Sequence, residues 1–324
     1  MKTKEIKEKT SLREKLSNIP NAGVIGIMLV FIIVVVASTG SKFFTVDNIT
    51  NLLRSVSIVG IMASAVTLIM ITGNIDLSLG WMIGFTACIT GANSSNFGTA
   101  ILLALAAGIA CGALNGFLVG VLRLNAFITT LGTMYIFKGI AMMYANNRLV
   151  TAANGSKILQ YIGQGYLLKV PLPVWIFLVV ALIFGFLLAR TNFGSKIYYV
   201  GANFVSAKFS GINSSLVIAL TYILAGLATG LAGTVFYAKV MSVQAYSGVG
   251  LEFDVLTAIV LGGTSVTGGK GSVAGTVLGV VFVGILGNGF TLMGLGANAQ
   301  YITQGLILLI AMRADVMRSR GLRA

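Results

Sequence analysis

The sequence contains no histidine, only two cysteines and only eight acidic residues. Without histidine, the chain lacks the commonest general base and the commonest metal ligand, and two cysteines are too few for a structural zinc site. Glu252 and Asp254 are the closest pair among the acidic residues, and an i, i+2 pair does not share a helix face. These absences argue against a metal-dependent enzyme and against catalysis by a carboxylate dyad.

A nucleotide-binding P-loop is also missing. The glycine-rich run "GGTSVTGGKGS" at 262–272 contains Gly-Gly-Lys, but the P-loop pattern requires glycine at Thr264 and serine or threonine at Gly271. We interpret this run as a tight turn that lets two helices approach closely. We therefore expect no cofactor on this chain.

Charge is scarce and apolar residues are abundant. Only 9% of the residues are charged, against about 25% in an average soluble domain, while 56% are hydrophobic and the mean hydropathy is +0.95. Apolar windows, most of them close to the roughly 20 residues that span a bilayer as a helix, fill most of the chain, and the shorter ones at 79–93, 255–264 and 299–312 leave nine to eleven crossings open, with broken or tilted helices. They predict an all-α polytopic membrane protein with about ten transmembrane helices. The windows are 22–40, 55–72, 79–93, 99–122, 127–145, 171–189, 215–237, 255–264, 273–295 and 299–312.

The net charge of +14 is distributed as a topology signal rather than as a nucleic-acid-binding patch. Basic residues precede the first window and follow the last, so an even number of crossings places both termini in the cytoplasm. On this topology Arg123, Arg190, Lys196, Lys208 and Lys270 are also cytoplasmic. Against the rule, five basic residues lie outside: Lys42, Arg54, Arg148, Lys157 and Lys169. We expect a basic tail at 1–20, one transmembrane domain at 21–313 and a basic tail at 314–324.

Two polar segments interrupt the hydrophobic pattern. The first, "ITGNIDLSLG" at 71–80, places Asp76 between two apolar windows, where Asp76 or Ser78 is expected to cap the helix that begins near Leu79. The alternative is a broken-helix element that moves during transport. The second segment, about 190–214, contains "NFVSAKFSGI", which predicts a short amphipathic helix capped by Asn203 and ended by Gly211.

These segments carry a resemblance to a known family. The quoted motifs, with "NAFITTLGTMYIFKGIAMMY" at 125–144, "GYLLKVPLPVWI" at 165–176, "FGSKIYYVGANFVSAKFSGI" at 193–212 and "GLEFDVLTAIVLGGTSVTGGKGSVAGT" at 250–276, resemble the permease subunits of bacterial ABC importers for monosaccharides of the ribose, galactose and xylose group. The resemblance covers some 270 residues and implies an ABC importer permease fold in the bacterial inner membrane.

The resemblance also implies partners. It predicts a dimer of permease subunits, either homomeric or heteromeric, two cytoplasmic ATPase subunits that bind the ATP, and an extracytoplasmic sugar-binding protein. The family's ATPase-coupling loop corresponds here to Gly201, Asn203, Ala207, Lys208, Ser210 and Gly211. Where relatives carry acidic residues this chain has Phe204 and Val205, so docking is expected to depend more on apolar burial than on ion pairs.

A neutral sugar requires hydrogen-bonding groups along its path, and the predicted spans supply several. The candidates for the translocation path are Asn74, Asp76, Asn125, Thr129, Gln300 and Gln304. A permease of the same fold for a nucleoside, a polyol or a signalling furanone is the first alternative. An ion-coupled secondary transporter is the second, although such proteins generally use intramembrane ionisable groups, which are few here.

Overall fold

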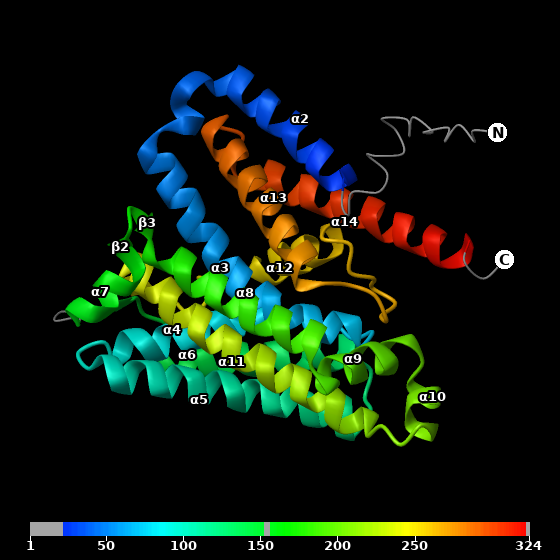
Figure 1. The fold of residues 1–324 in the computed structure, drawn as a ribbon. Helices are drawn as coiled ribbons and strands as arrows, with labels where there is room; N and C mark the ends of the chain where they lie inside the picture. The colour runs from blue at the N-terminus through cyan, green and yellow to red at the C-terminus, as the bar shows by residue number, and fades with distance from the viewer. Residues whose placement is uncertain (1–21, 152–155, 322–324) are drawn as a thin grey trace, which may run out of the picture.

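A computed structural model describes residues 22–151 and 156–321, so the predicted tail at 1–20 lies outside the described residues. Figure 1 shows a protein built almost entirely from helices. The elements are α2 (Ala22–Thr39), η1 (Gly40–Phe44), α3 (Val46–Ile71), α4 (Leu79–Ala92), α5 (Phe97–Gly116), η2 (Phe117–Val121), α6 (Ala126–Tyr144), β1 (Val150–Thr151), α7 (Lys157–Gln164), β2 (Tyr166–Leu167), β3 (Val170–Pro171), α8 (Leu172–Arg190), α9 (Asn192–Ala202), α10 (Phe204–Phe209), α11 (Ser214–Val240), β4 (Ser242–Val243), α12 (Leu251–Leu261), α13 (Val273–Leu292) and α14 (Gly296–Gly321).

The prediction of an all-α polytopic membrane protein is confirmed. Within the described ranges, seven helical segments are long and apolar enough to cross a membrane, and α4 is a shorter apolar helix. The remaining two of the ten predicted windows overlap α12 and α14. The four strands form only two short antiparallel pairs, β1 with β4 and β2 with β3.

Several predicted helix boundaries were wrong, because polar residues continue the helices beyond the apolar windows. Helix α3 begins at Val46 rather than at 55. Its first turns carry Asn48, which exchanges hydrogen bonds with Asn288, and Arg54, which donates to the Gln164 carbonyl oxygen. Helix α14 similarly continues to Gly321, so part of the predicted C-terminal tail at 314–324 is helical.

The loops and short elements separate into two ends of the helical bundle. Figure 1 shows α7, β2 and β3 at one end and α9 and α10 at the opposite end. The β4 strand follows α11 in the sequence. It pairs with β1, which precedes α7, so β4 also lies at the α7 end. We call these the α7 end and the α10 end.

Helices α3 and α11 form the centre of the bundle, with most of their hydrophobic windows buried, whereas α2 is largely exposed. Close packing against α11 depends on glycine. A Cβ added at Gly108 of α5 would overlap the carbonyl oxygen of Gly226, and one at Gly112 would overlap that of Tyr222. The glycine rows therefore let two helix backbones touch, as small residues do in membrane proteins.

Candidate functional site

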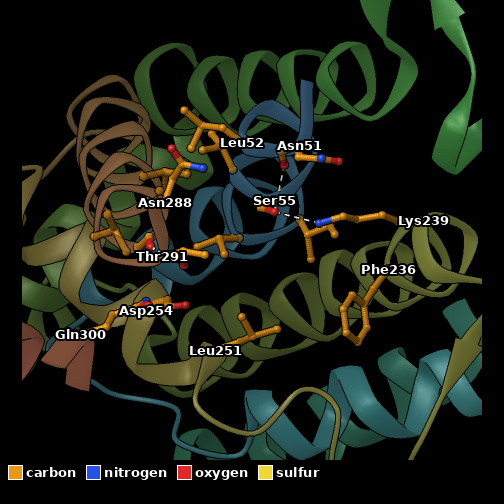
Figure 2. A pocket seen from close by; sticks show the side chains of 17 residues that line it. Asn51, Leu52, Ser55, Phe236, Lys239, Leu251, Asp254, Asn288, Thr291 and Gln300 are labelled. Atoms are coloured by element: carbon orange, nitrogen blue, oxygen red, sulfur yellow. Dashed lines mark hydrogen bonds between the residues drawn. The ribbon is translucent and has the colours of Figure 1, made fainter. Parts of the chain in front are cut away.

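A cavity of ≈ 320 Å³ lies among α3, α11, α12, α13 and α14. It is nearer the α7 end, because each wall contributes residues close to that end of its helix. Asn51 and Ser55 come from the first half of α3, Lys239 from the end of α11, and Asn288 from the end of α13. Figure 2 shows these polar side chains around the cavity together with Leu52, Phe236 and Leu251.

The cavity combines hydrogen-bonding groups with apolar surface. The Lys239 ammonium group donates to Ser55 Oγ at 2.7 Å, as the dashed line in Figure 2 marks. On another wall, Asp254 Oδ1 accepts from Gln304 Nε2 at 2.6 Å. The charged groups are thus oriented by neutral partners, which is an arrangement suited to a small polar ligand with several hydroxyl groups.

The structure separates the predicted path residues. Gln300 lines the cavity, and Gln304 supports Asp254 from the same helix face. Asn125 instead caps α6 by accepting from the Ile128 backbone N–H, at the α10 end. Thr129 follows it in the first turns of that helix, and neither residue belongs to the cavity lining. Asn74 and Asp76 lie in the break between α3 and α4, also outside this lining.

Sequence reasoning did not select several polar residues of the cavity, among them Asn51, Ser55, Lys239 and Asp254. One signal was available. Asn51 and Ser55 are an i, i+4 pair and therefore share a face of α3, as Gln300 and Gln304 do on α14. For Lys239 the sequence offered only an isolated charge at the end of an apolar stretch, and for Asp254 a charge two residues after Glu252 at the start of another.

Asp76 belongs to a second polar cluster, which is almost completely buried. Its Oδ1 accepts from the backbone N–H of Ser78 at 2.9 Å and from Ser78 Oγ at 2.6 Å. Its Oδ2 accepts from Asn115 Nδ2 at 3.2 Å, and the same Asn115 group donates to Ser78 Oγ at 2.9 Å. Tyr222 Oη donates to the Ile75 carbonyl oxygen at 2.9 Å. The cluster therefore fastens the break between α3 and α4 to α5 and α11.

The expected capping role at α4 was wrong. Ser78 is the N-cap residue, but its side chain accepts no hydrogen bond from a backbone N–H of the first turn, and Asp76 bonds to Ser78 itself rather than to the helix. The carboxylate instead accepts a hydrogen bond from the side chain of Asn115, which is 39 residues away in sequence. Its position in a break between helices is as predicted.

The substitution Asp76→Asn is expected to keep transport within about fivefold of wild type, since a neutral hydrogen bond contributes only about 1 kcal/mol. Asparagine retains the oxygen that accepts from Ser78. Its new amide group would face Asn115, whose Oδ1 is buried without a partner and is available as an acceptor once the side chain turns. Uptake per amount of membrane-inserted protein measures this. If Asp76→Asn inserts normally but does not transport, the negative charge itself is required.

At the α10 end, the predicted amphipathic helix is present as α10. Asn203 caps it by accepting from the Ser206 backbone N–H at 2.9 Å, and Gly211 follows with a φ of +80°. Both local predictions are confirmed. Val205 and Phe209 share one face and are 59% and 88% exposed, respectively. A short helix that exposes its apolar face outside the spans is typical of a protein-docking element.

Other residues of this element hold it against the bundle. Ala207 is buried on the inner face of α10, whereas Lys208 and Ser210 are exposed at its end. Phe204, at a position where an acidic residue was expected, lies 5.1 Å from the Arg123 guanidinium carbon, measured to the ring centroid. This cation–π contact joins α10 to the loop between α5 and α6.

Gly201 lies where three segments meet. A Cβ on Gly201 would overlap the carbonyl oxygen of Ile71 and the backbone N of Gly269, and Gly269 N–H donates to that same Ile71 oxygen at 2.8 Å. Tyr198 Oη also donates to the Gly271 carbonyl oxygen at 2.7 Å. Helix α9 is thus in direct contact with the end of α3 and with the glycine-rich turn. The contact residue of α3, Ile71, lies five residues before Asp76 in the sequence.

Comparison with known proteins gives matches over nearly the whole chain. Residues 48–312 match the family described as "Branched-chain amino acid transport system / permease component". The "Ribose import permease protein RbsC" of Escherichia coli (strain K12) is 36% identical over 294 residues, which cover 89% of this chain and 92% of that relative. The protein of the same name in Bacillus subtilis (strain 168) is 35% identical, with coverage of 90% and 91%.

A relative with another cargo is also similar. The "Fructose import permease protein FrcC" of Rhizobium meliloti is 34% identical over 289 residues, which cover 85% of this chain and 79% of the relative. Comparison with solved structures gave no match.

Proposed function

The chain belongs to the family of transport-system permease components that residues 48–312 match, and from this premise we propose that it is the membrane-spanning subunit of an ATP-driven sugar importer. The similarity to ribose import permeases along 89% of the chain is the observation that carries the proposal. We propose a bacterial inner-membrane location with both termini in the cytoplasm, which makes the α10 end cytoplasmic and the α7 end extracytoplasmic.

Energy enters this importer through the cytoplasmic docking element. The chain contains no P-loop sequence, so separate ABC ATPase subunits bind the ATP and contact the exposed face of α10. Closure of these subunits then moves α9 and α10. The contacts of α9 with Ile71 and the glycine-rich turn support this route, because they pass the displacement directly to α3 and to the loop before α13.

The cavity supports a sugar as cargo. Asn51, Asp254 and Gln300 supply amide and carboxylate groups that bind hydroxyls, while Phe236 and Leu251 supply apolar surface for ring carbons. We propose that cargo from an extracytoplasmic binding protein passes through this cavity in a dimer of permease subunits. A ribose-like monosaccharide is favoured by the relatives named for ribose. Nucleosides, polyols and furanones are the alternatives with similar hydrogen-bonding chemistry.

Reconstitution in liposomes tests this function. The permease, its ATPase subunits and its binding protein are combined, and uptake of radiolabelled ribose is measured with ATP, with a non-hydrolysable ATP analogue and with a proton or sodium gradient alone. We expect uptake only with ATP. Uptake driven by an ion gradient without ATP would contradict the proposal and favour a secondary transporter. Competition by unlabelled fructose, nucleoside or polyol then ranks the cargo classes.

A further inference from the structure

The α7 end carries a compact structure that the proposed transport path does not use. We call residues 156–171, which comprise α7 and the β2–β3 hairpin, the outer cap (Figure 1). Leu159 is buried on its inner face, and a Cβ on Gly163 would overlap the backbone of Ala238. Within the outer cap, Tyr161 Oη donates to the Tyr166 carbonyl oxygen at 3.1 Å. The outer cap is therefore a packed element rather than a loose loop.

The tip of the hairpin has an unfavourable backbone. Tyr166 pairs with Pro171 and Leu167 with Val170, which leaves Leu168 and Lys169 as a two-residue turn. Their φ angles are +52° and +64°, and two consecutive positive φ angles define the turn for which Asn-Gly is the usual sequence. Leu168 is nevertheless 80% exposed. A strained turn that presents a large apolar side chain to solvent indicates that the side chains themselves are needed there.

The charged residues of this region are all basic. Lys157 and Lys169 are exposed on the outer cap, and Arg148 is exposed in the preceding segment. Residues 145–171 contain these three basic residues and no acidic residue. Translocated loops are usually depleted of lysine and arginine, so three cations in one extracytoplasmic segment depart from the positive-inside rule. They would be matched by carboxylates on a partner.

Contacts also connect the outer cap to the cavity. Arg54 donates to the Gln164 carbonyl oxygen at 2.7 Å, and Gln164 Nε2 donates to the Lys239 carbonyl oxygen at 3.1 Å. Arg54 precedes Ser55, and Ser55 and Lys239 both line the cavity and bond to each other. A displacement of α7 therefore acts on α3 and α11 at two walls of the cavity.

We propose that the outer cap is the surface on which the cargo-delivering binding protein docks, and that this partner presents carboxylates around an apolar recess that receives Leu168. The proposal rests on the proposed function, since it places the outer cap outside the cytoplasm. Docking at Leu168, Lys169 and Lys157 would hold the partner above the cavity. The same contact would displace α7 and so act on the Lys239–Ser55 bond.

The test measures binding separately from uptake. The complete transporter is placed in nanodiscs, and the fluorescently labelled, sugar-loaded binding protein is titrated against it. The double variant Leu168→Asn/Lys169→Gly preserves the turn with its preferred sequence and removes both side chains. We expect it to weaken binding by about fivefold or more, given typical energies for an exposed apolar contact and an ion pair. Added salt should weaken the wild type more than this variant.

Lys42→Glu is the matched control, because Lys42 is exposed at the same end but lies outside the outer cap. Equal binding by wild type and by the double variant would overturn the proposal. So would an effect that appears only when the nanodisc contains anionic lipid, since that outcome assigns the cations to lipid headgroups. Failure of ATP-driven uptake with normal, cap-dependent binding would instead refute the proposed transport mechanism and leave the docking surface intact.

Discussion

Replacing Gly201 with valine is expected to reduce ATP-driven uptake by roughly 30-fold or more, which corresponds to about 2 kcal/mol, within the usual cost of overpacking. The added side chain would meet the Ile71 carbonyl oxygen and the Gly269 backbone, and neither of these groups is the movable end of a side chain. Helix α9 would then be displaced from α3. We expect binding of the binding protein to remain, because the outer cap lies at the other end of the bundle (Figure 1).

Gly139→Val is the matched control for this experiment. Gly139 is also a helical glycine, in α6, but a Cβ there meets no atom within 4 Å. Both variants are measured for membrane insertion and for sugar uptake in the reconstituted transporter. Wild-type uptake by Gly201→Val at normal insertion would show that close contact between α9 and α3 is dispensable for coupling.

Asp254→Asn is expected to lower the apparent kcat/KM for cargo by roughly 10- to 100-fold, because a hydrogen bond to a charged group contributes about 1.5–3 kcal/mol. Asparagine keeps an oxygen that accepts from Gln304 Nε2, so the local fold should be preserved. What is lost is the negative charge at the cavity wall. Uptake is measured across a range of loaded binding-protein concentrations.

Asp47→Asn provides the comparison for Asp254→Asn. Asp47 lies in the first turn of α3, is exposed, and does not line the cavity. If both variants transport like the wild type, the cavity is not part of the path. A loss confined to Asp254→Asn supports passage of cargo through the cavity.

Local features of the sequence predicted local features of the structure well. The short helix capped by Asn203 and the break that contains Asp76 both follow from residues within one or two turns of each other. These local features can be predicted from sequence because caps and positive φ angles depend on neighbouring backbone groups. The apolar windows likewise identified the longer apolar helices, since a bilayer requires a continuous apolar segment.

Features made by distant residues could not be predicted in this way. The partner of Asp76 is Asn115 on another helix, and its presence replaced the expected cap with a buried cluster. The cavity requires five helices to bring Asn51, Lys239 and Asp254 together. Each of these residues alone resembles any polar residue near a helix end. The start of α3 was misplaced for a related reason, because the charge of Arg54 placed it outside the apolar window at 55–72, whereas in the structure it lies within α3 and bonds to Gln164.

The glycine contacts between α5 and α11 have a mechanical consequence. Helix α11 begins shortly after α10 and reaches Lys239 in the cavity, and its 27 residues span roughly 40 Å. Its backbone touches that of α5 at Gly108 and Gly112, so the two helices resist bending and sliding as a pair. We expect α5 and α11 to move together as one rigid body. A small tilt imposed at the α10 end would then change the cavity mouth without any element having to unfold.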